Sequence, residues 1–250
     1  MKKHKNNHKI KKIFLIFIVI FSIFPIIFFV IQKTPKSLDG SRVKLVDNVG
    51  QNYFFRGSNP FVEKFGEKVF SYHDLKKYIN QTLEKEGKKP LQDFYLVDIS
   101  LLNLDAYFQI KEEQEFFKKY PHLGEVKNYS EIAPELLLTP FSSNPIAYKI
   151  TKNYHEKLTK LLQEIRQTLE KESDKPVVIY AHCNAGRDRT GALSASYRML
   201  YQNMDLPQAV NKNIEEVQRS AESLLKSSVS SYCNYLQKEH KKERKSCGEQ

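Results

Sequence analysis

The sequence predicts an α/β protein in which helices flank a central, mostly parallel sheet. Residues 94–99 and 177–181 are rich in β-branched and aromatic side chains, so each predicts a buried strand. Residues 152–171 place leucine and isoleucine at helical spacing on one face, which predicts a long amphipathic helix between these two strands. Strands that alternate with helices are typical of βαβ units, whose strands run parallel.

The other elements are predicted from apolar periodicity and from the residues that begin and end helices. Further strands are expected at residues 43–46, 53–55 and 136–141. Further helices are expected at residues 71–86, 111–119, 192–200, 209–219 and 221–236. Ser71 is the predicted cap of the first of these helices, and Asp205 with Gln208 forms a capping box before the fourth.

The first 31 residues predict a membrane anchor. Residues 1–12 carry six lysines, and residues 13–31 form an apolar run without a charge. As a helix this run spans about 28 Å at about 1.5 Å per residue, close to a hydrocarbon core of about 30 Å. Because the basic residues precede the run, we expect the N-terminus in the cytoplasm and the folded domain on the extracytoplasmic side of a single-pass membrane protein.

A cleaved secretory signal is the alternative interpretation of the apolar run, and it would make the protein secreted. The run is long for such a signal, and no small-x-small cleavage site follows it, so the uncleaved anchor is favoured. The predicted organisation is a basic cytoplasmic end at 1–12, a transmembrane signal anchor at 13–31, a linker at 32–42, one folded domain at 43–237 and a charged tail at 238–250.

The net charge of +11 does not predict binding to nucleic acid. More than half of the positive excess lies in residues 1–12, whereas nucleic-acid-binding domains present a basic face of the fold. The three cysteines are Cys183, Cys233 and Cys247, and they have no zinc-binding spacing. No metal or other cofactor is therefore expected, and Cys233 could pair with Cys247 if the domain is extracytoplasmic.

Residues 182–191 concentrate the chemistry of the chain. They read His-Cys-Asn-Ala-Gly-Arg-Asp-Arg-Thr-Gly and join a predicted strand to a predicted helix. Backbone amides at a helix N-terminus bind phosphate oxygens and lower the pKa of a cysteine, so Cys183 is a candidate nucleophile. Arg189 can bind two phosphate oxygens through its planar guanidinium, and Thr190 can donate its hydroxyl to the sulfur. Gly186 allows the left-handed backbone that such a cradle needs.

This His-Cys-x5-Arg-Thr-Gly pattern resembles the signature loop of the protein tyrosine phosphatase superfamily. A buried structural cysteine beside a polar turn is the alternative, but three charged side chains at 187–189 suit a core turn badly. The resemblance implies a cysteine-dependent hydrolase that forms a phosphocysteine intermediate, most simply a protein tyrosine or dual-specificity phosphatase. Its catalytic residues would be Cys183, Asp188, Arg189 and Thr190. Its phosphate-binding residues would be Asn184, Ala185, Gly186, Arg187, Asp188 and Arg189.

The variable positions of the loop are similar to those of a bacterial subgroup of this superfamily, which has Ala-Gly-Lys-Asp-Arg-Thr-Gly. Members of that subgroup are described as acting on phosphotyrosine, phosphoserine or phosphothreonine, and phosphoinositides. Arg187 could accordingly reach further phosphates on an inositol ring, or it could lie solvated at the rim of the site. The expected partners are a phosphorylated protein or a phosphoinositide, together with the membrane, and no nucleic acid.

Three residues are second-tier site candidates. His182 precedes the cysteine in the signature loop. Arg56 begins Arg-Gly-Ser-Asn-Pro, which is similar to an element near the start of dual-specificity-like and phytase-like members, where the arginine lies close to the active-site face. Asp98 stands near the carboxyl end of a predicted strand, and ligand crevices form at such strand ends.

The chain departs from the superfamily in its general acid. Most members supply an aspartate from a loop roughly thirty to forty residues before the cysteine, which protonates the leaving oxygen. Residues 139–149 contain no aspartate, so Asp188, Asp98 and Asp105 are the candidates. Asp188 could instead form a salt bridge that shapes the loop. A chain without this acid could also be a pseudophosphatase that binds phosphate without turnover. A poor acid matters less for an aryl ester than for an alkyl one, which favours phosphotyrosine.

Overall fold

The computed structural model describes residues 37–64, 67–130, 145–218, 223–240 and 247. The apolar run at 13–31 and the predicted strand at 136–141 lie outside these ranges. Within them, no helix combines the length and the apolar character that crossing a bilayer requires.

Helices and strands alternate along most of this part of the chain. The strands are β1 (Lys44–Val49), β2 (Asn52–Gly57), β3 (Phe61–Lys64), β4 (Glu67–Phe70), β5 (Tyr95–Ser100), β6 (Gly124–Asn128) and β7 (Val177–His182). The α-helices are α2 (Tyr72–Lys85), α3 (Tyr107–Lys119), α4 (Pro145–Glu170), α5 (Asp188–Tyr201), α6 (Leu206–Val217) and α7 (Ser223–His240). Two short 3₁₀ helices are η1 (Gly40–Arg42) and η2 (Leu104–Ala106).

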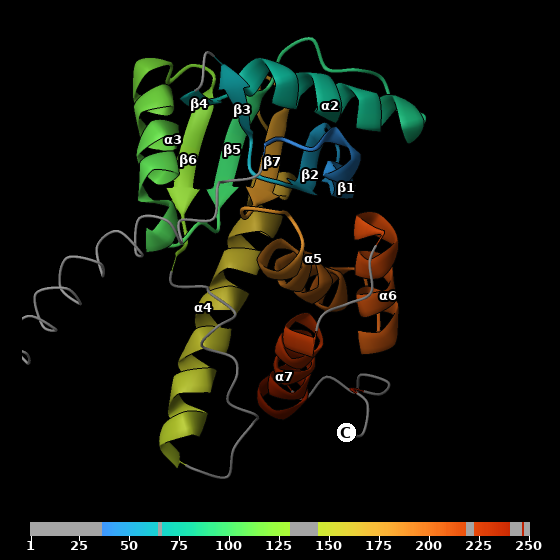
Figure 1. The fold of residues 1–250 in the computed structure, drawn as a ribbon. Coiled ribbons are helices and arrows are strands. Elements are labelled where there is room, and N and C mark those ends of the chain that lie inside the picture. Colours follow the sequence, from blue (N-terminus) through green and yellow to red (C-terminus); the bar gives the residue numbers. More distant parts are fainter. Residues whose placement is uncertain (1–36, 65–66, 131–144, 219–222, 241–246, 248–250) are drawn as a thin grey trace, which may run out of the picture. The chain divides into compact units, whose positions relative to one another are not determined.

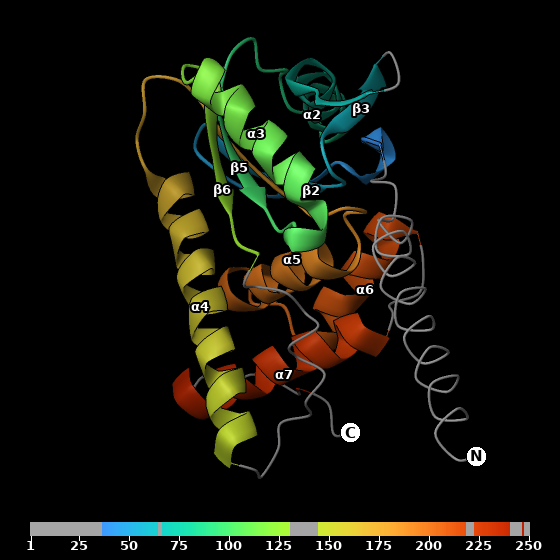
Figure 2. The same cartoon turned by 60° about the vertical axis from the view of Figure 1, so that its left-hand side comes forward.

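The main sheet has the strand order β1-β2-β7-β5-β6. Strands β2, β7, β5 and β6 run parallel, and β1 pairs antiparallel with β2 at one edge. Helices cover both faces of this sheet, with α2 and α3 on one side and α4 to α7 on the other (Figures 1 and 2). The predicted α/β class with a mostly parallel sheet is thereby confirmed, and β7, the strand that leads to Cys183, is at its centre.

Several boundaries and elements differ from the sequence prediction. Strand β6 was not expected, because Gly-Glu-Val-Lys-Asn shows neither an apolar run nor a clean alternation. The β3–β4 hairpin was also missed. Helix α3 begins at Tyr107 and α4 at Pro145, in both cases earlier than the apolar periodicity indicated. The end of the predicted linker forms η1, and α7 extends into the predicted tail as far as His240.

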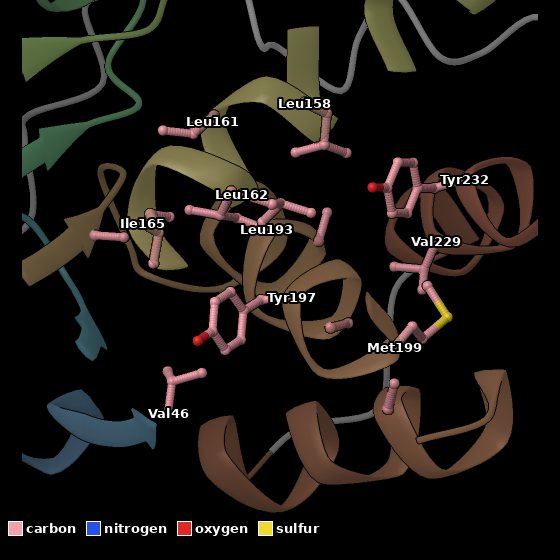
Figure 3. Close-up of a cluster of buried hydrophobic side chains, with 14 of the residues drawn as sticks. Val46, Leu158, Leu161, Leu162, Ile165, Leu193, Tyr197, Met199, Val229 and Tyr232 are labelled. Atoms are coloured by element: carbon pink, nitrogen blue, oxygen red, sulfur yellow. The ribbon is translucent and has the colours of Figure 1, made fainter. Parts of the chain in front are cut away.

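The two faces of the sheet carry separate hydrophobic cores. One core packs the sheet against α4, α5, α6 and α7, and Figure 3 shows Tyr197 of α5 and Leu162 of α4 within it. The other core packs the sheet against α2 and α3. Successive strand residues point to opposite faces, so Ile179 enters the first core and Tyr180 the second. The alternation continues at the end of β7, where His182 meets α3 and Cys183 joins the core of α5.

A disulfide closes the C-terminal part of the described chain. Cys233 of α7 is bonded to Cys247, which leaves Cys183 as the free cysteine. The two partners are 14 residues apart in the sequence.

Candidate active site

The loop after β7 wraps around the sulfur of Cys183 before α5 begins at Asp188. The wrapping requires a left-handed residue at Gly186, whose φ is +65°. A Cβ at this position would lie 2.3 Å from the carbonyl oxygen of Gly57 on the neighbouring strand β2. Glycine is therefore needed at position 186 for two reasons, its backbone conformation and the close approach of β2.

The carbonyl groups of the loop are bound by donors from the rest of the domain. The Asn184 carbonyl accepts from the backbone amide of Asn59 at 3.3 Å, and the Ala185 carbonyl accepts from Arg42 Nη1 at 2.7 Å. The Gly186 carbonyl accepts from Arg56 Nη2 at 2.7 Å. Since these carbonyls are engaged outside the loop, its amides are available to a negative charge inside it, which is the arrangement of an anion-binding nest.

The thiol of Cys183 lies in a field that favours its thiolate. Burial opposes ionisation, but the Arg189 guanidinium, the Thr190 hydroxyl and the backbone amides of Thr190 and Gly186 outweigh it, so the pKa of Cys183 is lowered. A thiolate is the nucleophilic form of cysteine, and α5 adds the positive end of its dipole.

Arg189 is held at the mouth of the loop by the end of the neighbouring strand. Its Nη1 donates to the carbonyl of Leu101 at 2.6 Å, directly after β5. The amide of Leu101 in turn donates to the carbonyl of His182 at 2.8 Å. The Leu101 carbonyl thus fixes Nη1 of Arg189, while the positive charge of the guanidinium lowers the pKa of Cys183. Such a brace orients the guanidinium toward an anion above the sulfur.

Arg56 is a buried brace that lies next to the loop and contacts its backbone at Gly186. Its side chain is 1% exposed and reaches beneath the loop from β2. Nη2 donates to the Gly186 carbonyl, and Nη1 donates to Ser194 Oγ, Asn213 Oδ1 and Glu216 Oε2. Burial lowers the pKa of Arg56, and the nearby Glu216 carboxylate opposes that effect. Arg56 therefore connects α5 and α6 to the loop and does not face solvent.

His182 and Asp98 meet on the opposite side of the sheet from Arg56. His182 Nε2 lies 3.1 Å from Asp98 Oδ1, and all three side chains of a cluster completed by Glu113 of α3 are fully buried. Asp98 is therefore not exposed in a ligand crevice, and its burial removes it from the candidates for the general acid. The sequence pattern does not identify Glu113 as a site residue, because it lies among similar charged residues of a polar helix.

The remaining acid candidates occupy two different places. Asp188 is the first residue of α5, and no ion pair joins it to a cation among the residues that the structure describes. Asp105 lies exposed in η2, four positions after Leu101, whose carbonyl holds Arg189. Four residues of chain span at most about 14 Å, which keeps Asp105 near the rim of the loop. The upstream window around Glu135 lies outside the described residues.

Arg42 is the other residue that sequence reasoning missed. It was placed in a linker, yet its guanidinium binds the Ala185 carbonyl and pairs with Asp39 at 3.0 Å. No sequence signal marks it, since a single arginine after Gly-Ser is common in loops. The capping box of α6 is confirmed, with Asp205 accepting from the Gln208 amide and Gln208 accepting from the Asp205 amide.

One family model matches the part of the chain that contains the loop. The sequence model of the tyrosine phosphatase family matches residues 109–210, a range that contains the whole loop. A crystal structure of Tk-PTP in the active form is similar, with 16% identity, a TM-score of 0.40, and coverage of 79% of this chain and 95% of that chain. A crystal structure of PTPMT1 has 14% identity, a TM-score of 0.37, and coverage of 78% and 98%. The curated proteins include no significant match.

The family match and the geometry of the loop point to the same assignment. The match covers the nucleophile, the arginine and the helix behind them. The structure places Cys183, Arg189 and Thr190 around one anion-binding loop at a strand–helix junction. The resemblance of this chain to the protein tyrosine phosphatase superfamily, whose tyrosine phosphatase family model it matches, is thus confirmed.

Proposed function

We propose that the protein is a cysteine-dependent phosphatase that hydrolyses phosphate monoesters, with phosphotyrosine in a protein as its first substrate class. The observation that carries this proposal is the position of Cys183 in a loop whose carbonyls are engaged by Arg42 and Arg56, a setting that lowers the pKa of the thiol. The sulfur would attack phosphorus, and the bond from phosphorus to the leaving oxygen would break as that oxygen takes a proton. Water would then attack the phosphocysteine, which releases inorganic phosphate and restores the thiolate.

Each loop residue has a defined task in this reaction. The amides of residues 184–189 and the Arg189 guanidinium stabilise the equatorial oxygens of the transferred phosphoryl group. Thr190 stabilises the sulfur as it leaves in the second step, because its hydroxyl already favours the thiolate. Cys183→Ser should remove hydrolysis of p-nitrophenyl phosphate, and Arg189→Lys should reduce it by about 10²-fold or more while the fold remains intact. Full activity in Cys183→Ser would refute this mechanism.

We assign the general acid to Asp105, with Asp188 as the competing residue. Asp105 is exposed and lies four positions after Leu101, whose carbonyl holds Arg189 at the mouth of the loop. Loss of a general acid slows esters of poor leaving groups most. Asp105→Asn should therefore lose much more rate with phenyl phosphate than with p-nitrophenyl phosphate, and Asp188→Asn should not show this dependence. The reverse pattern would transfer the role to Asp188.

A phosphoinositide or inositol phosphate is the second candidate substrate, and Arg187 supports it. Its side chain is half-buried in the loop, and its Nε is buried without a hydrogen-bond partner among the described residues. A guanidinium beside the phosphate loop can bind a second phosphate through its terminal nitrogens. Arg187→Ala should raise KM for a bisphosphorylated inositol lipid and leave KM for a phosphotyrosine peptide nearly unchanged. Equal effects on both substrates would remove the support for the lipid.

Slow turnover would instead indicate a phosphate-binding pseudophosphatase. Its signature would be a single burst of p-nitrophenol equal to the enzyme concentration, followed by no further release. Steady turnover after the burst would exclude this alternative.

We further propose that the domain is held at a membrane on its extracytoplasmic side. The uncharged apolar run at 13–31 and the disulfide between Cys233 and Cys247 support this location, because disulfides persist in oxidising compartments. The full chain should fractionate with membranes and a chain without residues 1–31 should not. A soluble full-length chain whose N-terminal residues are intact would contradict the anchor.

A further inference from the structure

Three ionisable side chains from three elements are buried together behind the nucleophile. Asp98 comes from β5, Glu113 from α3 and His182 from β7, and each is 0% exposed. His182 Nε2 lies 3.1 Å from Asp98 Oδ1 and 3.3 Å from Glu113 Oε1. One nitrogen thus faces two carboxyl groups in a part of the fold that excludes water, where an uncompensated charge is costly.

In the described part of the chain, no second cation lies within ion-pair distance of this cluster. From β5 the cluster is faced by Asp98 and the Ser100 hydroxyl, and from α3 by Glu113. From β7, Tyr180 stacks on the His182 ring at 5.8 Å between centroids, and Cys183 acts on His182 through its charge. Among the described residues, His182 is the sole possible cation in ion-pair distance of either carboxyl group.

Charge balance determines how many protons such a cluster holds. Two ionised carboxylates with one imidazolium would leave a buried negative charge directly behind a thiolate, which is unfavourable. One proton on His182 and one on Glu113 make the cluster neutral. The oxygens of Asp98 and Glu113 have no aligned hydrogen-bond donor among the described residues, and one oxygen of each carboxyl group lies within 4.8 Å of the other. A proton on Glu113 therefore removes a like charge from beside Asp98.

We propose that Asp98 and Glu113 are positioning residues that share two protons with His182 and so keep one positive charge on the imidazole behind Cys183. Either carboxyl group can serve as the ionised partner of the imidazolium, and the other then carries the proton. This role deepens the proposed phosphatase function and rests on it, because a stabilised thiolate matters for a nucleophilic sulfur.

The electrostatics agree with this arrangement. Burial opposes a charge on His182, but Asp98 and Glu113 outweigh it and raise its pKa to about 9. Burial raises the pKa of Glu113, and the neighbouring Asp98 carboxylate acts in the same direction, although His182 opposes both. At neutral pH the imidazole is then charged and Glu113 holds its proton.

The test measures the pKa of the Cys183 thiol in the full chain by the pH dependence of its alkylation with iodoacetamide. The other two cysteines are paired, so the reaction reports on Cys183 alone. Glu113→Gln keeps the neutral form of this side chain, so the pH midpoint of alkylation should rise much less in this variant than in the double variant. Asp98→Asn with Glu113→Gln removes both possible anions, so alkylation at pH 6.5 should fall about tenfold or more.

The pH profile of kcat/KM separates the proposal from a merely structural role. The profile is recorded for p-nitrophenyl phosphate in the Asp105→Asn background, because deprotonation of the general acid gives an alkaline decline of its own. In that background, ionisation of Glu113 adds a negative charge behind the sulfur, so kcat/KM should still decline on the alkaline side. Glu113→Gln should lose this decline, whereas the exposed control Glu115→Gln on the same helix should retain it. These single variants keep the test valid if the double variant does not fold.

Three results would overturn the proposal. The first is an unchanged thiol pKa in the double variant. The second is a rise in thiol pKa in Glu113→Gln alone as large as in the double variant, or an alkaline decline that this variant keeps. The third is a stoichiometric divalent metal in the purified wild type that the double variant lacks, since these three side chains could also ligate an ion. A wild type that is alkylated as expected but hydrolyses no phosphate ester would refute the function and not the cluster.

Discussion

Replacement of Arg56 by lysine tests whether the buried Arg56 guanidinium holds the loop at 183–189 in its conformation. Arg56 is buried and donates through Nη2 to the Gly186 carbonyl at 2.7 Å and to the Arg187 carbonyl at 3.4 Å. Its other terminal nitrogen binds Glu216 Oε2 at 2.9 Å. A lysine ammonium is a point charge on a single stem, so it can keep the pair with Glu216 but cannot also reach the loop.

The expected magnitude follows from the groups that lose their partners. A buried carbonyl without a donor costs about 1–3 kcal/mol, and Gly186 would be left in this state. The longer hydrogen bond to the Arg187 carbonyl would also be lost. Together, the two losses should lower the free energy of unfolding by about 2–3 kcal/mol. The amides of the loop would also shift from their positions around the phosphate, and the loss of one well-placed donor costs about 10²-fold in kcat.

The assay compares kcat for p-nitrophenyl phosphate and thermal unfolding in Arg56→Lys and in Arg198→Lys. Arg198 is equally buried and binds the same Glu216 carboxylate, but it makes no contact with the loop carbonyls. The control should lose similar stability and keep kcat within about twofold at a temperature where both variants are folded. Equal losses of kcat in both variants, or an Arg56→Lys enzyme with wild-type kcat, would refute the bracing role.

Three further outcomes are expected. Gly186→Ala should abolish activity and lower the unfolding temperature, because its Cβ would clash with the backbone of β2; an active alanine variant would contradict the left-handed loop. Reduction of the disulfide between Cys233 and Cys247 should cost about 3 kcal/mol of stability without loss of the nucleophile, and an unchanged melting temperature under reductant would oppose this. The pKa of His182 is raised to about 9 because Asp98 and Glu113 outweigh burial, so the folded state holds a proton that the unfolded state loses above pH 6.5. The unfolding temperature should therefore fall as pH rises from 6.5 to 9. It is measured in Cys183→Ser, because ionisation of the Cys183 thiol would raise the stability of the folded state over the same pH range. An unfolding temperature that rises with pH in this variant would contradict the assignment.

The catalytic loop and its surroundings could be predicted because local sequence determines them. The apolar strand, the Gly-rich turn and the start of α5 lie within residues 177–201, and the spacing of Cys183 and Arg189 follows from that turn. The capping box of Asp205 and Gln208 is local in the same sense. Such features depend on neighbours in the chain, so one sequence is sufficient to find them.

The support of the loop could not be predicted, because it depends on contacts between distant segments. Arg42 contacts Ala185 across 143 positions, and Glu113 reaches His182 from a helix whose neighbouring acids are solvated. Asp98 was expected at a crevice, but the pairing of β5 with β7 places it beside His182 in the interior. Strand β6 is likewise specified by its partner β5 and not by its own polar residues.

The proposed reaction passes through a covalent bond between phosphorus and the sulfur of Cys183. The measurement is rapid mixing of the full chain with p-nitrophenyl phosphate, an acid quench and mass spectrometry of the peptide that contains Cys183. We predict that Cys183 is phosphorylated in the wild type and that the phosphorylated fraction increases when hydrolysis of the phosphocysteine is slowed. We predict no phosphorylated residue 183 in Cys183→Ser. Steady turnover with an unmodified Cys183 at every time point would contradict the account.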